Sequence, residues 1–518
     1  MKRETAIEKI KSTDTWDIVV IGGGASGLGI ALEACARGYS TLVVEQSDFA
    51  KSTSGKSTKL VHGGVRYLAQ GNLALVREAS VERGLLFNNA PHLVKNQTFI
   101  IPVYNRWNRL KYTLGLKLYD WIAGRLSLGS SIFISRKKVL EKLPGILSKN
   151  LFGGILYHDG QFDDARLAIN LAQTIFDNGG HAVNYMKVDG LLKDDNRICG
   201  VKVIDGETGE TFNIKATTVI NATGVFADDI LKMDNPGANK NIAVSQGIHL
   251  VLDKSFLPGK DALMIPETSD GRVLFIVPWH DRLLAGTTDT PVQDVTLEPV
   301  AQEKEIEFIL NTAAQYLTLT PKRKDVLSVF AGLRPLAASK EKGIATKEIS
   351  RSHKIMVLPS NLFTIIGGKW TTYRKMGEDM IDKVEKESGF KQTMSRTGSL
   401  RIHGFAVAGD DSDPLYYYGS DKGSINKIMA QTGDVWISEK LNIHKAQVIW
   451  AVREEMARTV EDVLSRRTRA LLLDAKESSR IAPTVAAIMA DEMNKDEGWI
   501  ALQVRSYNIV AGNYSLDD

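Results

Sequence analysis

The chain contains 518 residues, of which 43% are hydrophobic and 24% charged, and its formal net charge is +4 at pH 7. These values indicate a soluble globular protein of about two or three domains and exclude the strongly basic composition of a nucleic-acid binder. Cys35 and Cys199 show no metal-ligand spacing, so we expect no metal site and a reducing, cytoplasmic location. No segment contains the roughly 20 apolar residues of a membrane helix, so any membrane contact is expected to be peripheral.

The N-terminal segment carries the most informative motif. We expect a strand at residues 16–21, then Gly22-Gly23-Gly24-Ala25-Ser26-Gly27, a helix, and a second strand at residues 41–44 that ends at Glu45. Gly22 permits a sharp turn, Gly24 lets a pyrophosphate approach the backbone, and Gly27 lets helix and strand pack closely. The Glu45 carboxylate can accept hydrogen bonds from both hydroxyls of an adenosine ribose. The segment predicts a dinucleotide-binding fold, and the motif alone does not distinguish FAD from NAD.

A polar loop at residues 47–58 follows this unit. Its Ser54-Gly55-Lys56-Ser57 run is similar to the end of a P-loop, but Ala50 stands where the first glycine is required, so we expect no ATP site. Hydroxyls and backbone amides in this position suit the phosphates and ribityl chain of a flavin. The cofactor-binding residues assigned to this region are Thr53, Ser57, Lys59, His62, Gly63 and Gly64.

Later segments repeat the pattern of an apolar strand followed by a glycine turn. Strands are expected at residues 198–204 and 211–214, and a further strand from residue 216 ends in an Ala-Thr-Gly turn at Gly224. That turn is typical of a strand end beside a flavin, although an ordinary β-turn fits the segment equally well. A strand at residues 362–366 leads into Gly367-Gly368-Lys369, where a helix start favours an anion. We therefore assign Gly224, Gly368, Lys369 and Thr371 to the cofactor site.

The C-terminal part, after a polar linker near residues 391–413, shows helical spacing of apolar residues at 447–473 and 481–493. It contains no catalytic constellation. A cap, a lid and a dimer surface remain alternatives for its role.

In chain order, the motifs GGGASG, STKLVHGGVRYL, DDARL, NATG, PW, GTTD, GLRPL and GGKWTTYR resemble those of the FAD-dependent glycerol-3-phosphate dehydrogenases, over essentially the whole chain. The resemblance implies an α/β fold with a glutathione-reductase-type FAD-binding Rossmann domain, an interleaved mixed-sheet substrate domain and an α-helical C-terminal cap domain. The expected boundaries are about 1–85, 155–240 and 340–390 for the FAD-binding domain, about 86–154 and 241–339 for the substrate domain, and 391–518 for the cap.

The resemblance also implies the reaction. It is the oxidation of sn-glycerol 3-phosphate to dihydroxyacetone phosphate, with hydride passing to the flavin N5 and electrons passing on to a membrane quinone. An oxidase that uses oxygen on the same substrate and a flavin-binding module without turnover remain alternatives.

Arginines are the expected ligands of the substrate phosphate, which carries about −1.5 to −2 charges at neutral pH. Arg66 follows a Gly-Gly turn and Arg334 lies between Gly332 and Pro335, in segments too constrained and apolar for ordinary surface. Each could instead be a structural arginine bonded to backbone carbonyls. The resemblance favours the phosphate role, with Tyr67 donating a phenolic hydrogen bond to the same group.

Hydride transfer also needs a base for the proton of the alcohol. His249 interrupts an apolar strand pattern, SQGIHLVL, and flanking arginines would lower its pKa and keep it neutral. Such a histidine could equally be a satisfied core residue, but the resemblance implies that it lies at the substrate. The catalytic residues assigned are His249, Arg334 and Lys369, the last either polarising the flavin or substrate hydroxyl or simply capping a turn.

A quinone acceptor requires contact with a bilayer. Two stretches mix basic with aromatic or apolar residues, one at 106–112 extended to Trp121 and one in the helix 371–386. Either could instead be a helix packed on the core with its charges in water. We expect a cytoplasmic protein, with peripheral contact at the inner face of the cytoplasmic membrane and a homodimer both left open.

Overall fold

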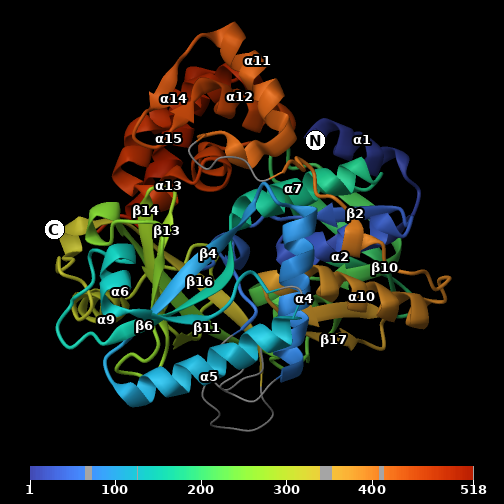
Figure 1. Ribbon diagram of the computed structural model, residues 1–518. Coiled ribbons are helices and arrows are strands. Elements are labelled where there is room, and N and C mark those ends of the chain that lie inside the picture. The colour runs from blue at the N-terminus through green and yellow to red at the C-terminus, as the bar shows by residue number, and fades with distance from the viewer. Residues whose placement is uncertain (65–72, 125–126, 339–352, 408–412, 517–518) are drawn as a thin grey trace.

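The structure, a computed structural model, describes residues 1–64, 73–124, 127–338, 353–407 and 413–516 (Figure 1). Two β-sheets lie side by side, and a cluster of C-terminal helices packs at one end of the molecule. The chain crosses between the sheets several times, so each sheet is assembled from segments that are far apart in sequence.

The first sheet has eight strands and is built around β1 (Trp16–Ile21), which pairs in parallel with β2 (Thr41–Val44) and β10 (Thr211–Asn221). β10 also pairs in parallel with β18 (Leu362–Ile366). β10 is one continuous strand, whereas the sequence pattern predicts two strands, one at residues 211–214 and one from residue 216. The remaining strands are β7 (His181–Val183), β8 (Met186–Asp194), β9 (Arg197–Asp205) and β17 (Lys354–Val357). The parallel strands end along one edge, where the glycine motif begins.

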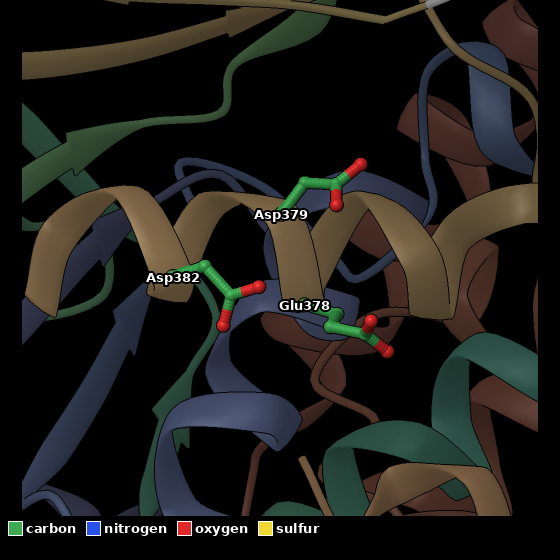
Figure 2. A group of neighbouring side chains, drawn as sticks. All are labelled: Glu378, Asp379 and Asp382. Carbon is green, nitrogen blue, oxygen red and sulfur yellow. The ribbon is translucent and has the colours of Figure 1, made fainter. Parts of the chain in front are cut away.

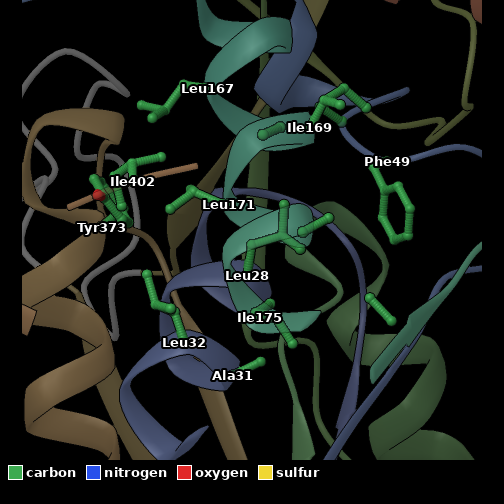
Figure 3. Packing of buried hydrophobic residues seen from close by; sticks show 14 of the residues in the cluster. Leu28, Ala31, Leu32, Phe49, Leu167, Ile169, Leu171, Ile175, Tyr373 and Ile402 are labelled. Carbon is green, nitrogen blue, oxygen red and sulfur yellow. The ribbon is translucent and has the colours of Figure 1, made fainter. Parts of the chain in front are cut away.

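Helices cover both faces of this sheet, which explains why every residue of β1 except Asp17 is apolar and buried. Ile18 and Val20 pack against α2 (Ala25–Ala36), α7 (Asp164–Asp177) and α10 (Tyr373–Ser388). Figure 3 shows the contact between α2 and α7, with Leu28 and Leu171 at its centre. Val19 and Ile21 point to the other face, against α1 (Arg3–Ser12) and α8 (Ala227–Asp234).

The second sheet has ten strands, in the order β15-β11-β14-β13-β12-β4-β6-β3, with β16 beside β11 and β5 beside β6. It is mixed, because β12 and β4 are parallel while the other pairs are antiparallel. The strands are β3 (Leu60–Val61), β4 (Val94–Val103), β5 (Ile132–Ser135), β6 (Gly153–Phe162), β11 (Ile242–Asp253), β12 (Ala262–Ile265), β13 (Leu274–Trp279), β14 (Arg282–Gly286), β15 (Thr290–Val292) and β16 (Val326–Ala337). β3 lies within the first segment expected for the FAD-binding domain, and β6 crosses the expected boundary at residue 155, yet both pair in this second sheet.

Four helices accompany the second sheet: α4 (Leu73–Asn89), α5 (Arg106–Ala123), α6 (Arg136–Lys142) and α9 (Glu303–Ala314). The inner side of α5 packs Leu116 onto the sheet, whereas its outer side exposes a row of apolar side chains. These are Trp107 (79% exposed), Leu110, Leu114, Leu118 and Trp121 (78% exposed). They recur every three or four residues and therefore lie on one face of the helix. No helix among the described residues is both long enough and apolar enough to cross a bilayer.

The second amphipathic stretch found in the sequence behaves differently. α10 buries its apolar residues Met376, Met380, Ile381 and Val384 in the core of the first sheet. The alternative interpretation, a helix packed on the core with its charges outside, therefore describes this stretch.

The C-terminal helices form a separate layer at the top of Figure 1. They comprise α11 (Lys422–Thr432), α12 (Lys445–Glu454), the π-helical η10 (Asp462–Arg467), α13 (Ala470–Leu473), α14 (Ala475–Met493) and α15 (Glu497–Gly512), beside a hairpin of β19 (Trp436–Ser438) and β20 (Ile443–His444). The helical spacing seen at 447–473 is thus divided among three helices. Their apolar core continues into the second sheet through Trp279, Leu284 and Phe330.

Candidate active site

A cavity of about 670 Å³ lies between the two sheets. Its walls come from the carboxyl ends of β1 and β2, the loop 46–58, the turn at residues 222–226, strands β11 and β16, and the turn at residues 367–371. A ligand at the carboxyl ends of parallel strands is the usual arrangement in such sheets. The volume is within the range of ligand pockets, about 300–1,000 Å³.

The glycine motif forms one end of the cavity. Gly22 has φ +111°, and a Cβ there would overlap the carbonyl of Ala222, so only glycine fits this turn. A Cβ on Gly24 would lie 3.0 Å from the Ser54 hydroxyl. Gly22 and Gly24 line the cavity, whereas Gly27 is buried under the motif where helix and strand meet. The backbone at the start of α2 therefore faces the cavity, where the N–H of Ala25 donates to the Ser54 hydroxyl at 3.0 Å.

Glu45 lies beside this turn and lines the cavity. Its carboxylate accepts the backbone N–H of Gly23 at 2.6 Å and that of Ser47 at 2.9 Å. Burial raises the pKa of Glu45, and the two N–H groups act in the opposite direction. A carboxylate has about four lone-pair sites, so both oxygens can also accept ribose hydroxyls.

The loop 46–58 supplies hydroxyl groups to the cavity wall, but Lys59 does not line it as expected. The Lys59 ammonium is fully buried, 2.6 Å from Asp164 Oδ1 and 2.7 Å from the carbonyl of Gly55. Lys59 has φ +61°, and this left-handed turn directs its side chain away from the cavity and toward α7. Thr53 and Ser57 do line the cavity, and their hydroxyls donate to Leu333 O and Asp164. Lys59 is therefore a structural cation beneath the loop.

His62 also lines the cavity. Gly63 donates its N–H to Asp159 at 3.1 Å, and a Cβ there would overlap the hydroxyl of Tyr119. Gly63 and Gly64 are absent from the cavity wall among the described residues. The predicted substrate residues Arg66 and Tyr67 lie outside the described residues.

Gly224, Gly368, Lys369 and Thr371 all line the cavity, as the sequence predicts. The turn at 367–371 is bound to the loop 46–58 because Trp370 donates its indole N–H to the carbonyl of Ser54 at 2.8 Å. The glycine motif, the loop 46–58 and the turn at 367–371 form one continuous wall, although the first and the last are about 340 residues apart in sequence.

His249 lies on β11, with only 2% of its surface exposed. Its Nε2 lies 2.9 Å from the Thr58 hydroxyl, and its ring stacks on Phe330 with centroids 5.0 Å apart. Nδ1 is buried and has no hydrogen-bond partner within the described part of the chain. Burial, followed by the positive charges of Arg334 and Lys59, holds the pKa of His249 well below its ordinary value. The imidazole is therefore neutral at physiological pH and can accept a proton.

Arg334 lies on β16, and its guanidinium is held by the GTTD turn. Nη2 donates to the Thr287 hydroxyl and the Thr288 carbonyl, both at 3.0 Å, and Nη1 lies 3.4 Å from Asp289 Oδ1. The structural alternative for Arg334 is thus partly right, since one backbone carbonyl accepts from it. The guanidinium nevertheless lines the cavity.

The register of β11 and β16 relates these two side chains. His249 pairs with Phe330, Gly247 with Gly332, and Ser245 with Arg334. Residues two apart on a strand share a face, so His249, the glycine pair and Arg334 lie on one face of β11 and β16. A Cβ on Gly247 would overlap the Arg334 guanidinium, and one on Gly332 would come within 2.8 Å of Lys56 Cβ. The missing side chains let Arg334 and Lys56 lie close against the two strands, where His249 and Arg334 both line the cavity.

Comparisons with known proteins agree with this site. A family model described as FAD dependent oxidoreductase matches residues 17–369, and one described as the C-terminal domain of alpha-glycerophosphate oxidase matches residues 366–498. The mitochondrial glycerol-3-phosphate dehydrogenase of Bos taurus is 39% identical over 537 aligned residues, covering 96% of this chain and 73% of that protein. The enzyme of the same name from Saccharomyces cerevisiae is 36% identical, covering 96% and 89%. The chain belongs to the FAD-dependent glycerol-3-phosphate dehydrogenase family.

A solved member of this family has the same fold. The glycerol-3-phosphate dehydrogenase of Bacillus halodurans, solved with FAD, superposes with a TM-score of 0.80 at 28% identity, covering 100% of this chain and 98% of that one. The L-alpha-glycerophosphate oxidase of Mycoplasma pneumoniae shares the fold, with a TM-score of 0.59 at 17% identity. The family assignment makes FAD the cofactor, and the Gly22 turn, the bare backbone at Gly24 and the open lone pairs of Glu45 fit it.

Other residues of the cavity wall are not singled out by the sequence. Arg272 and Asp159 both line it. Asp159 accepts from the buried Arg83 at 2.6 Å and from Tyr119 of α5 at 3.2 Å. Their only local signal is a charged residue next to an apolar strand, which is common on ordinary surfaces.

The acidic residues on α10 form a further cluster (Figure 2), and none of the three lines this cavity. Glu378, Asp379 and Asp382 bring their carboxylates within 4.8 Å of one another. Basic partners already balance these charges: Arg374 and Lys375 for Glu378, His353 and Lys375 for Asp379, and Arg37 for Asp382. The cluster is thus part of a surface ion-pair network.

Proposed function

We propose that this chain oxidises sn-glycerol 3-phosphate to dihydroxyacetone phosphate with bound FAD. The observation that carries the proposal is that neutral His249 and cationic Arg334 share one face of β11 and β16 and both line the cavity. A base and a phosphate-binding cation in one cavity suit a small molecule that carries both a hydroxyl and a phosphate. A flavin-binding module without turnover would need neither.

The reaction removes a hydride from C2 of the substrate and a proton from its hydroxyl, which leaves a carbonyl. FAD, when bound, supplies the hydride acceptor at its N5. His249 accepts the hydroxyl proton, and burial, aided by the positive charge of Arg334, lowers its pKa and keeps the imidazole neutral until then. Arg334, fixed by the GTTD turn, pairs with the phosphate and orients C2. Lys369, also on the cavity wall, adds a second positive charge, and Arg66 and Tyr67 are proposed as further phosphate ligands.

Anaerobic mixing of the holoenzyme with glycerol 3-phosphate tests the substrate. We expect rapid loss of oxidised flavin absorbance with the phosphate ester and none with glycerol or lactate. Arg334→Ala is expected to retain FAD and lose the bleaching. If the flavin stays oxidised with every compound, the proposed activity is wrong, although the FAD-binding fold is unaffected by that result.

We propose further that the electrons pass to a membrane quinone and that α5 makes the bilayer contact. The support is the exposed row from Trp107 to Trp121, flanked by the exposed basic residues Arg109 and Lys117. In addition, Phe275 and other apolar residues line part of the cavity and belong to the cluster beneath α5. A cytoplasmic enzyme held on the inner face of the cytoplasmic membrane follows from this proposal.

Two measurements test the acceptor. The reduced enzyme is mixed with a short-chain quinone or with oxygen, and reoxidation by quinone without hydrogen peroxide is expected. Rapid peroxide formation would instead favour the oxidase alternative. Sedimentation with anionic vesicles should be lost in the Trp107→Ser/Trp121→Ser variant and kept in Met394→Ser, which removes an apolar side chain that is 89% exposed outside α5.

A further inference from the structure

The loop 46–58, called here the cofactor loop, forms much of the cavity wall yet has little regular structure. Its one helical element is the single turn η1 (Thr53–Gly55). Ala50 has φ +58°, a left-handed conformation that a residue with a side chain adopts only rarely. The shape of this loop must therefore be imposed by contacts from outside it.

Some of those contacts, described above, come from β16, α7 and Trp370, and the others come from the C-terminal helical layer. Asp48 is fully buried, and its carboxylate accepts hydrogen bonds from Arg466 Nε and Arg467 Nη1 of η10. Lys51, which lines the cavity, pairs with Glu461 at 2.8 Å. Two residues of the loop, Asp48 and Lys51, are thus bound by residues more than 400 positions later in the chain.

The arginines are themselves fixed within this network. Arg466 donates to Glu461 Oε1 at 2.9 Å and to Asp462 Oδ1 at 2.7 Å. Asp462 also accepts the Tyr185 hydroxyl at 2.7 Å, and Tyr185 N–H donates to the carbonyl of Ser47 at 2.8 Å. Every link returns to the cofactor loop or to the residues beside it. π-Helical segments are rare in proteins, and those that occur often lie at functional sites.

The network contains equal numbers of negative and positive groups, and separating them would cost free energy. The three carboxylates of Asp48, Glu461 and Asp462 face the three cations of Lys51, Arg466 and Arg467. Removing one partner from a buried pair leaves an uncompensated charge, which is strongly destabilising. The layer and the loop therefore hold their geometry together or lose it together.

We infer that the C-terminal layer is part of the FAD site, because the network formed by Asp48, Lys51, Glu461, Arg466 and Arg467 holds the cofactor loop in its binding shape. These are positioning residues. Because coupling between two equilibria is reciprocal, FAD also tightens the docking of η10 onto the flavin domain. The inference needs FAD as the cofactor and is independent of the substrate proposed above.

The variant Glu461→Gln tests it, with Glu492→Gln as the matched control. Both carboxylates belong to the C-terminal layer, pair with arginine and are similarly buried, with 13% and 16% of the side chain exposed. Glu492 pairs with Arg453 of the same layer and does not reach the cofactor loop. FAD is titrated into each apoprotein at a temperature well below melting, and flavin fluorescence gives the dissociation constant.

We expect Glu461→Gln to weaken FAD binding about tenfold and Glu492→Gln to leave it within twofold. In the wild type, FAD should slow hydrogen exchange of the amides at residues 458–467, and this protection should shrink in Glu461→Gln. Glu461→Asp, which keeps the charge, provides a folded comparison if Glu461→Gln fails to fold, with an intermediate dissociation constant expected. A lower melting temperature with unchanged FAD affinity, or an equal loss of affinity in both glutamine variants, would overturn the inference.

Discussion

The substitution Gly247→Ala isolates the role of Arg334 without touching its charge. The new methyl group would come within 2.6 Å of Cζ, Nη1 and Nη2 of Arg334. Both strands are fixed by their pairing, so the guanidinium must leave its contacts with Thr287 and Thr288. One charge-assisted hydrogen bond to a ligand contributes about 1.5–3 kcal/mol. At 1.4 kcal/mol per factor of ten, losing one such bond to the phosphate weakens substrate binding about 10- to 150-fold.

Anaerobic titration of the flavin absorbance with glycerol 3-phosphate gives the affinity directly. FAD content should be unchanged, because Gly247 lies on β11 and not in the glycine motif, the cofactor loop or the turn at 367–371. Gly190→Ala is the control, since it adds the same methyl group to a strand glycine whose nearest neighbour, Lys202 Cβ, is 3.9 Å away. If Gly247→Ala binds and reduces like the wild type, Arg334 does not hold the phosphate and the substrate geometry proposed here is wrong.

Further predictions concern the base, a buried ion pair and a titrating histidine. Gly286→Ala would press a methyl group against the ring of His249, so stopped-flow flavin reduction should slow while substrate affinity is kept. Because the pKa of His249 is lowered, the wild-type reduction rate should stay constant from pH 8 to about 6.5 and fall only in more acidic buffer. Asp164→Asn leaves the fully buried Lys59 unpaired, and chemical denaturation should show a loss of about 3–5 kcal/mol; an unchanged stability would contradict the ion-pair assignment. Burial opposes protonation of His403, but two carboxylates outweigh it and raise its pKa to about 9, so its stabilisation is complete below about pH 6.5 and lost as the pH rises through 9. His403→Gln should remove that alkaline loss from a pH series of melting temperatures.

The residues assigned to the cofactor are easiest to place from sequence where they directly follow the strands that position them. Gly22, Gly24 and Glu45 lie within one local unit whose geometry a motif can encode. Lys59 shows the limit of this reasoning. Its side chain is directed by a left-handed turn toward Asp164, a partner 105 residues away, and nothing in the local pattern specifies that turn.

The substrate end depends on strand register, which the pattern of residues does not give. Arg334 is a sound candidate from its sequence context, but its fixation by Thr287 and Thr288 follows from how β11, β14 and β16 pair. The amphipathic stretches illustrate the same problem. α5 and α10 have comparable patterns, and only tertiary packing buries the apolar side of α10 while leaving that of α5 exposed.

The interleaving of the two sheets has a consequence for synthesis of the chain. β10 needs β18 as its second parallel neighbour, and β18 comes some 140 residues after it. Until β18 emerges from the ribosome, one edge of the first sheet is unpaired and open to association with other chains. The turn at 367–371 and then η10 arrive later still, so high-affinity capture of FAD must await nearly the whole polypeptide. Free flavin is therefore needed when synthesis of the chain is nearly complete, and not while its first domain segments emerge.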